Sequence, residues 1–124
     1  MQLNMDGEKP IFLQFAENLE EGILKGIFEE GSQIPSTTEV AVKFKINPAT
    51  ANRGVNLLVD EGIVYKKRGI GMFVASGARE KIISKRRKTF YDSYVLPLIK
   101  ESNNLKLEKS EILNMIEKGY GKCA

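Results

Sequence analysis

The sequence contains no histidine and a single cysteine, Cys123, among its 124 residues. Without histidine the chain cannot assemble a Ser-His-Asp or Cys-His catalytic set or a histidine-ligated metal site. One cysteine cannot form an internal disulfide, and its place beside the C-terminus favours an inert thiol in a reducing compartment over a redox sensor. We therefore predict a protein that is not an enzyme and that uses no metal ion or other cofactor.

Long apolar runs are missing as well. No segment approaches the roughly 18 apolar residues that a membrane span requires. The opening residues MQLNMDGEKP are polar and acidic, unlike the basic and then apolar start of a signal peptide. With 42% hydrophobic and 28% charged residues, the composition is typical of a globular protein. We expect a cytoplasmic chain without membrane contact, forming one ordinary domain or a small domain with an appendage.

Positive charge is distributed unevenly along the chain. Residues 1–77 carry 8 Lys or Arg and 10 Asp or Glu, whereas residues 78–124 carry 11 and 6. Within the acidic part, residues 43–68 hold six Lys or Arg against two acidic residues. The location of these charges is therefore a better guide to the binding partners of the protein than its small net charge of +3.

The first part of the chain predicts two helices separated by a turn. Apolar residues recur every four positions after Pro10, which predicts an amphipathic helix that ends near Gly26. A short helix over residues 36–44 (STTEVAVKF) can be capped by Ser36 or Thr37. The apolar stripe of the first helix consists of Ile11, Phe15, Leu19, Ile23 and Ile27, and it is widened by Phe12, Ala16, Leu24 and Phe28.

A third helix begins at a proline. Pro48 has no backbone N–H and would disrupt a helix interior, but Asn47 before it is a preferred N-cap residue. This pair predicts a helix that starts at Pro48 and stops at Gly62. Its apolar face consists of Ala51, Val55, Leu58 and Val59, and its polar face of Ala49, Arg53 and Asn56, with Asn52 on the flank.

A hairpin follows the third helix. Residues 63–67 (IVYKK) and 72–75 (MFVA) predict two short strands, and residues 68–71 (RGIG) predict the tip between them. Gly69 and Gly71 allow the tip to adopt positive φ angles. Helix, turn, helix and a glycine-tipped basic hairpin form a winged helix-turn-helix arrangement.

The remainder predicts two further helices. A stretch without glycine over residues 78–102 predicts a long helix bent at Pro97, and residues 110–119 predict a short helix that Gly119 ends. Two such helices cannot bury an independent core, so we expect their apolar side chains to pack against a second copy of the chain. The candidate dimerisation residues are Ile83, Phe90, Tyr91, Tyr94, Val95, Leu98, Ile112, Leu113 and Ile116.

The predicted fold class is mainly α with a small β-hairpin. Residues 1–75 are expected to form a winged helix-turn-helix DNA-binding domain, and residues 76–124 a short two-helix α-helical dimerisation segment. The expected partners are double-stranded DNA and a second copy of the chain.

Several short motifs occur together between Pro10 and Ala75. They are Pro10-Ile11, Leu13-Gln14, Gly31, Pro35-Ser36, Thr50, Arg53, Glu61-Gly62-Ile63, and Gly69, Gly71, Phe73 and Val74 in the hairpin. In combination they resemble the N-terminal domain of the GntR superfamily of bacterial transcriptional repressors. The resemblance implies a transcriptional regulator that binds a palindromic operator as a homodimer, and among regulators it favours a repressor.

The short tail is similar to that of the YtrA subfamily. The resemblance implies that the tail serves for dimerisation, lacks a large ligand cavity, and belongs to a regulator of transporter genes. The operator, the genes and any small-molecule effector stay unknown. The chain departs from the family at Thr38, Pro48 and Asn52, where relatives often carry arginine.

Bases would then be read by the remaining side chains of the third helix. Asn52 and Asn56 suit adenine, Ala49 suits a thymine methyl group, and Arg53 suits either a guanine or a phosphate. The full set of candidate DNA-binding residues is Ser36, Thr37, Thr38, Lys45, Asn47, Pro48, Ala49, Thr50, Asn52, Arg53, Asn56, Lys67, Arg68, Gly69, Ile70 and Gly71.

Several alternatives stay open at this level. Residues 36–38 can cap a helix, hold a phosphate or do both, and Thr50 can bond locally instead. The basic hairpin could guard a free strand edge, although its glycines favour insertion into a minor groove. The basic run over residues 79–88 fits a solvated helix face better than a surface that binds phosphate or an acidic partner. Leu57 is expected to meet another element or subunit and not DNA.

A second class of function competes with DNA binding. The missing arginines and the acidic first part also fit a winged-helix protein-interaction module that does not bind DNA. The absence of a gel shift with random-sequence duplexes, together with the capture of a partner protein in a pull-down, would favour that alternative.

Overall fold

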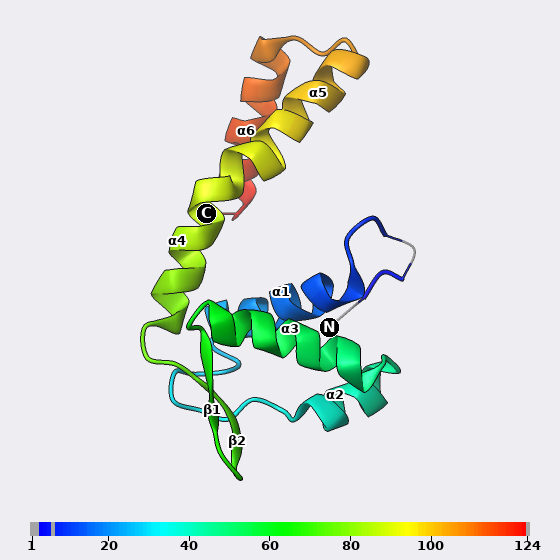
Figure 1. Ribbon diagram of the computed structural model, residues 1–124. Coiled ribbons are helices and arrows are strands. Elements are labelled where there is room, and N and C mark those ends of the chain that lie inside the picture. Colours follow the sequence, from blue (N-terminus) through cyan, green and yellow to red (C-terminus); the bar gives the residue numbers. More distant parts are fainter. Residues whose placement is uncertain (1–2, 6, 124) are drawn as a thin grey trace. The chain divides into compact units, whose positions relative to one another are not determined.

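The computed structural model describes residues 3–5 and 7–123, with the side chain of Cys123 excepted. The prediction of an inert Cys123 thiol therefore lies outside the described residues. The chain divides into two compact units, residues 1–84 and 85–124, and each is considered by itself. The element order is three helices, a two-stranded hairpin and a second group of helices (Figure 1).

Unit 1 is built on three helices, α1 (Ile11–Leu24), α2 (Thr37–Phe44) and α3 (Pro48–Asp60). Their apolar faces share one core, which includes Phe15, Leu19, Ile23, Val40, Ala51, Val55 and Leu58. The predicted helices are thereby confirmed in order and type. Ile27 is the exception within the first stripe, because α1 ends before it and its side chain is 69% exposed.

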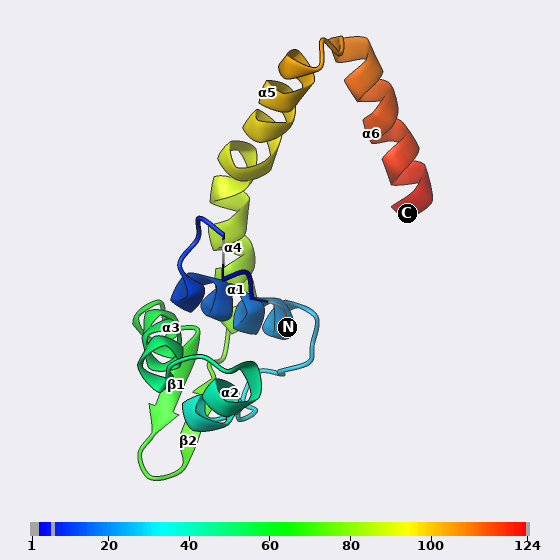
Figure 2. The same cartoon turned by 90° about the vertical axis from the view of Figure 1, so that its right-hand side faces the viewer.

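Helices α1 and α3 lie side by side in both ribbon views (Figures 1 and 2). Gly54 makes this close approach possible. A Cβ atom at Gly54 would lie 2.8 Å from the backbone oxygen of Phe12 and 2.8 Å from a ring carbon of Phe15. Any larger residue at this position would push the two helices apart.

The predicted hairpin consists of β1 (Val64–Lys67) and β2 (Gly71–Val74), paired antiparallel with Val64 opposite Val74. Residues 31–34 run along the other side of β2. The N–H of Gly31 donates to the oxygen of Val74 at 2.8 Å, and the N–H of Ile34 donates to the oxygen of Met72 at 2.9 Å. The hairpin is therefore tied to the segment before α2.

Helix α4 (Ala78–Phe90) begins in unit 1. Ala78 and Ile82 are fully buried in the core of unit 1. Ile83 is half-buried, and the sequence pattern had assigned it to a dimer interface. The division between the units thus lies inside α4, beyond the predicted boundary after Ala75. The assignment of DNA binding and dimerisation to the two parts stays a prediction.

The start of α4 is held by an acidic side chain from far along the chain. The Glu30 carboxylate accepts hydrogen bonds from the backbone N–H of Gly77 at 2.8 Å and of Arg79 at 3.3 Å. These groups precede or begin the helix and have no partner within it, so Glu30 supplies the missing acceptor.

Unit 2 continues the helical path as a π-helical turn, η1 (Tyr91–Val95), and α5 (Leu96–Asn104). The N–H of Leu96 donates to the oxygen of Tyr91, five residues back. Pro97 cannot donate, and its ring collides with the carbonyl group one α-helical turn earlier. The irregularity expected at Pro97 therefore takes the form of a wider turn just before it.

The last helix, α6 (Lys109–Cys123), is longer than predicted. It runs through Gly119 instead of stopping there, so the prediction that Gly119 ends the helix is wrong. Glycine ends a helix when it adopts a positive φ angle, and Gly119 does not, whereas Gly26 and Gly62 after α1 and α3 do. Helices α5 and α6 diverge from the turn that joins them (Figure 2).

In the part of the chain that the structure describes, no helix combines the length and apolar character needed to cross a membrane.

Candidate nucleic-acid interface

The turn between α2 and α3 is built from three residues with distinct tasks. Lys45 adopts a left-handed conformation, with φ 53° and ψ 43°, which ends α2 and reverses the chain. Ile46 is 8% exposed and anchors the turn in the core. Asn47 is the N-cap of α3, and its Oδ1 accepts a hydrogen bond from the N–H of Ala49 at 2.8 Å. Lys45 and Asn47 are both exposed.

The predicted start of the third helix at Pro48 is confirmed. Pro48 occupies the first helical position, where its missing N–H leaves no broken hydrogen bond. Pro48 and Ala49 are exposed and Thr50 is half-buried, so the first turn of α3 is largely free of intramolecular contact.

The N-terminus of α2 is capped by Ser36. Its Oγ accepts a hydrogen bond from the N–H of Glu39 at 3.1 Å, which makes Ser36 and not Thr37 the cap. Ser36 and Thr38 are exposed and Thr37 is half-buried. Of the two roles considered for these residues, capping is therefore confirmed at Ser36, and phosphate contact stays a prediction.

The outer face of α3 carries Asn52, Arg53 and Asn56, all exposed. An open hollow of about 550 Å³ lies on this face and is lined mainly by residues of α3. Phe12 of α1 also lines it, although its spacing had placed it on the apolar stripe of that helix, and it is not among the residues of the core cluster. The lining residues are Phe12, Ala49, Asn52, Arg53, Asn56, Leu57 and Asp60.

Arg53 does not extend freely from this face. Its guanidinium carbon lies 3.9 Å from the centre of the Phe12 ring, which is a cation–π contact. Leu57, one turn further along α3, is half-buried and packs against the core. The packing agrees with the expectation that Leu57 meets another element, but Leu57 also lines the hollow, so the expectation that it does not contact DNA stays a prediction.

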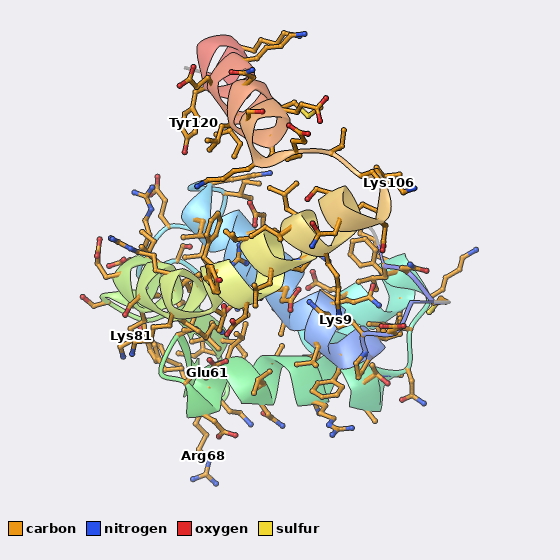
Figure 3. All side chains as sticks on the ribbon, turned by 90° about the horizontal axis from the view of Figure 1, so that it is seen from above. Lys9, Glu61, Arg68, Lys81, Lys106 and Tyr120 are labelled. Atoms are coloured by element: carbon orange, nitrogen blue, oxygen red, sulfur yellow. The ribbon has the colours of Figure 1, made fainter. Side chains whose placement is uncertain are left out.

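The hairpin tip presents cationic and backbone groups together. Arg68, Gly69 and Ile70 are exposed and Gly71 is half-buried, and the Arg68 side chain projects outward (Figure 3). Gly69 and Gly71 have φ angles of 77° and 146°, as predicted. Glycine is needed at both positions because other residues rarely adopt these angles.

Gln33 supports this tip, and sequence reasoning had missed it. Its Nε2 donates to the oxygen of Ile70 at 3.1 Å, and a Cβ atom at Gly71 would collide with the same side chain. No local pattern could have indicated the contact, because the two residues lie far apart in the chain.

The ammonium group of Lys67 lies close to two aromatic rings. Its ammonium group lies 4.4 Å from the centre of the Phe73 ring and 6.0 Å from that of Tyr65. The two rings stack across the strands with their centres 5.9 Å apart. Aromatic side chains thus hold a lysine next to the arginine at the tip.

The basic run in α4 separates into two kinds of residue. The Nζ of Lys81 donates to the oxygen of Gly62 at 3.2 Å and so satisfies a carbonyl group just beyond α3. Arg79, Arg87 and Lys88 are exposed, and both interpretations of these charges stay open.

Unit 2 leaves its apolar side chains uncovered. Phe90 and Tyr94 contact each other with ring centres 5.2 Å apart, yet both are more than half exposed. Among the described residues 85–122, Ser102 alone is buried. Of the candidate dimerisation residues in this unit, Val95 and Ile112 are half-buried, and the others are exposed, namely Phe90, Tyr91, Tyr94, Leu98, Leu113 and Ile116.

Among residues 3–5 and 7–123, no group of three or more Cys, Asp or Glu side chains is placed to hold a metal ion. The exposed groups on the outer face of α3 and at the hairpin tip are amides, cations and small apolar side chains, which are the groups that proteins use to contact DNA.

Comparison with known proteins extends beyond the winged helix. The chain is 29% identical to the HTH-type transcriptional regulator YhcF of Bacillus subtilis over 117 residues, 94% of this chain and 95% of YhcF. It is 30% identical over 83 residues to the HTH-type transcriptional repressor YtrA of the same organism, 67% of this chain and 64% of YtrA.

Among solved structures, a putative GntR-family transcriptional regulator from Bacteroides thetaiotaomicron superposes with a TM-score of 0.71 at 35% identity. The match covers 92% of this chain and 99% of that protein. Residues 13–74 match the family described as "Bacterial regulatory proteins, gntR family". The chain therefore belongs to the GntR family of transcriptional regulators, whose helix-turn-helix domain binds DNA.

Proposed function

We propose that this chain is a repressor that binds a palindromic operator as a homodimer. The observation that carries the proposal is the free outer face of α3, which begins at an exposed, capped first turn and shares its unit with a cationic, glycine-tipped wing. In this arrangement α3 enters the major groove and the hairpin tip enters the adjacent minor groove.

Each part of the interface then has its own role. Asn52 and Asn56 pair with adenine edges and Ala49 contacts a thymine methyl group, so the half-site is rich in A·T pairs. Lys45, Lys67 and Arg68 contact phosphates, and the N-termini of α2 and α3 present backbone N–H groups to them. These contacts place the protein on the duplex, whereas α3 selects the sequence.

A second copy of the chain would complete the molecule. Aromatic and aliphatic side chains of unit 2, among them Tyr91, Tyr94 and Leu98, are 57%, 67% and 42% exposed in a single copy. Exposed apolar surface on this scale marks an interaction site, and a homodimer is the commonest solution. Two copies would present two α3 helices to two half-sites, which explains why the operator should be palindromic.

The experiment is a binding titration of the full chain across salt concentrations. The duplex selected from a random pool is compared with a scrambled duplex of the same length and composition. We expect the selected duplex to bind at least a hundredfold more tightly, with the logarithm of both affinities falling linearly with that of the salt concentration. Equal affinity for both duplexes would exclude sequence-specific repression, and no binding to either would favour a protein-interaction module.

The resemblance to the YtrA subfamily extends the proposal to transporter genes as targets and to the cytoplasm as the place of action. Sequencing the genomic fragments that the purified protein retains would test the targets. Fragments without transporter genes nearby would contradict that part of the proposal and leave DNA binding unaffected.

A further inference from the structure

The contact between Arg53 and Phe12 joins two helices at the candidate interface. The guanidinium group of Arg53 on α3 lies 3.9 Å from the ring centre of Phe12 on α1, the shortest cation–ring distance among the described residues. Gly54, next to Arg53, lets the two helices approach at this point. The pair is therefore a product of the helix crossing.

Phe12 is not part of the hydrophobic core. Ile11 beside it packs against the core cluster, whereas Phe12 belongs neither to that cluster nor to the half-buried residues that pack on it. Its half-buried ring instead lines the hollow on the outer face of α3. An aromatic ring in this place does little for the core, so its role must lie at the surface.

The contact with the ring leaves the hydrogen-bonding groups of Arg53 free. Arg53 makes no hydrogen bond or ion pair with any other described residue, so its N–H donors are available. These donors lie in the guanidinium plane, and the ring attracts the cation through the perpendicular direction. A stacked arginine can therefore still form a bidentate contact with a guanine or a phosphate.

We propose that Phe12 is a positioning residue for DNA recognition. Its ring holds the Arg53 guanidinium group in one plane before DNA arrives, so that binding costs less side-chain entropy. The inference rests on the proposed function, because it needs Arg53 to contact the operator. It assigns to α1 a part in recognition that the helix-turn-helix alone does not contain.

The test is a double-mutant cycle on the full chain with the selected duplex. Phe12→Leu keeps an apolar side chain but removes the ring, Phe12→Tyr keeps the ring, and Arg53→Ala removes the cation. We expect Phe12→Leu to weaken binding about three- to tenfold and Phe12→Tyr to stay within about twofold. In the Arg53→Ala background, Phe12→Leu should change the affinity by less than about twofold.

A second readout reports the stacking without DNA. The ring current of Phe12 should shift the Nε–H and Hδ proton resonances of Arg53 in the free protein. Phe12→Leu should abolish that shift and Phe12→Tyr should keep it. Phe28→Leu is the matched control, because Phe28 packs against the core near Gly22 and lies outside this hollow, so it should leave both the shift and the affinity unchanged.

Two results would overturn the inference. An equal loss of affinity from Phe12→Leu with and without Arg53 would mean that Phe12 acts through packing, and an unchanged affinity would mean that it does nothing for binding. In either case the parent chain still binds its duplex and the proposed function stands. A parent chain that binds no duplex would instead overturn the proposed function.

Discussion

At the scale of single residues, the outer face of α3 defines where recognition can occur in the proposed complex. Pro48 serves to start α3. The outer face carries one cation, Arg53, between two asparagines. Affinity and sequence choice should therefore depend on different side chains, which can be tested one at a time.

Arg53→Ala should weaken binding to the selected duplex by about tenfold, because it removes a charge-assisted contact. Fluorescence anisotropy of a labelled duplex would measure the loss. Lys118→Ala on α6 is the control, since it removes an exposed cation that lies outside both the helix-turn-helix and the basic run of α4. An Arg53→Ala chain that binds as tightly as the parent would mean that our orientation of α3 is wrong.

Asn52→Ala should act on sequence choice more than on affinity. The amide pairs with one base edge, so its loss should reduce discrimination at one position of each half-site by about tenfold. Repeating the in vitro selection with the variant would reveal that position as the one that becomes degenerate. A selected motif identical to that of the parent would remove Asn52 from the set of base-reading residues.

At the scale of elements, glycines decide how helices meet and end. The effect of replacing a glycine depends on how much space surrounds its Cα atom. Gly54 lies in the crossing of α1 and α3, whereas a Cβ atom at Gly119 in α6 would have no neighbour within 4 Å. Both glycines are helical, so the same substitution should have opposite effects at the two positions.

Gly54→Ala should lower the free energy of unfolding by about 1–3 kcal/mol, because the new methyl group overlaps the backbone of Phe12 and the ring of Phe15. Gly119→Ala should increase helix stability by about 0.5–1 kcal/mol, because alanine is the better helix former. Urea unfolding followed by circular dichroism measures both. A neutral Gly54→Ala would mean that α1 and α3 can separate at little cost.

At the scale of the whole molecule, the arrangement predicts that folding and dimerisation can be separated. A chain ended after Ser84 keeps Ala78 and Ile82, which complete the core of unit 1, and lacks the exposed apolar side chains of unit 2. It should fold and be monomeric, and it should bind a two-half-site duplex at least about a hundredfold more weakly because it loses bivalency.

Sedimentation equilibrium would measure the mass of the shortened chain, and anisotropy its affinity. A chain ended after Gly77 is the matched control, since it also loses Ala78 and Ile82 and should be markedly less stable. A dimer of the chain that ends after Ser84 would move the interface out of unit 2 and contradict the proposed assembly.

The sequence by itself determined the features that depend on neighbouring residues. Asn47-Pro48 starts α3, and the glycines after α1 and α3 end them, since caps and positive φ angles are local. The cap of α2 was narrowed to Ser36 or Thr37, and the structure shows that it is Ser36. The apolar faces of the helices followed from periodicity for the same reason. The prediction at Gly119 was wrong because a glycine inside a helix and a glycine that ends one differ in their φ angle, which the sequence does not show.

The tertiary structure alone decided the contacts between distant parts of the chain. Gln33 supports the wing tip at Ile70, and Glu30 holds the start of α4. The guanidinium group of Arg53 lies over the Phe12 ring because α1 and α3 approach closely at a glycine. Such pairs are separated by about 37 to 47 residues in the chain, and only packing brings them within contact distance. The sequence therefore indicated which helix carries the candidate DNA-contacting face, and the fold determined how the arginine on that face is held.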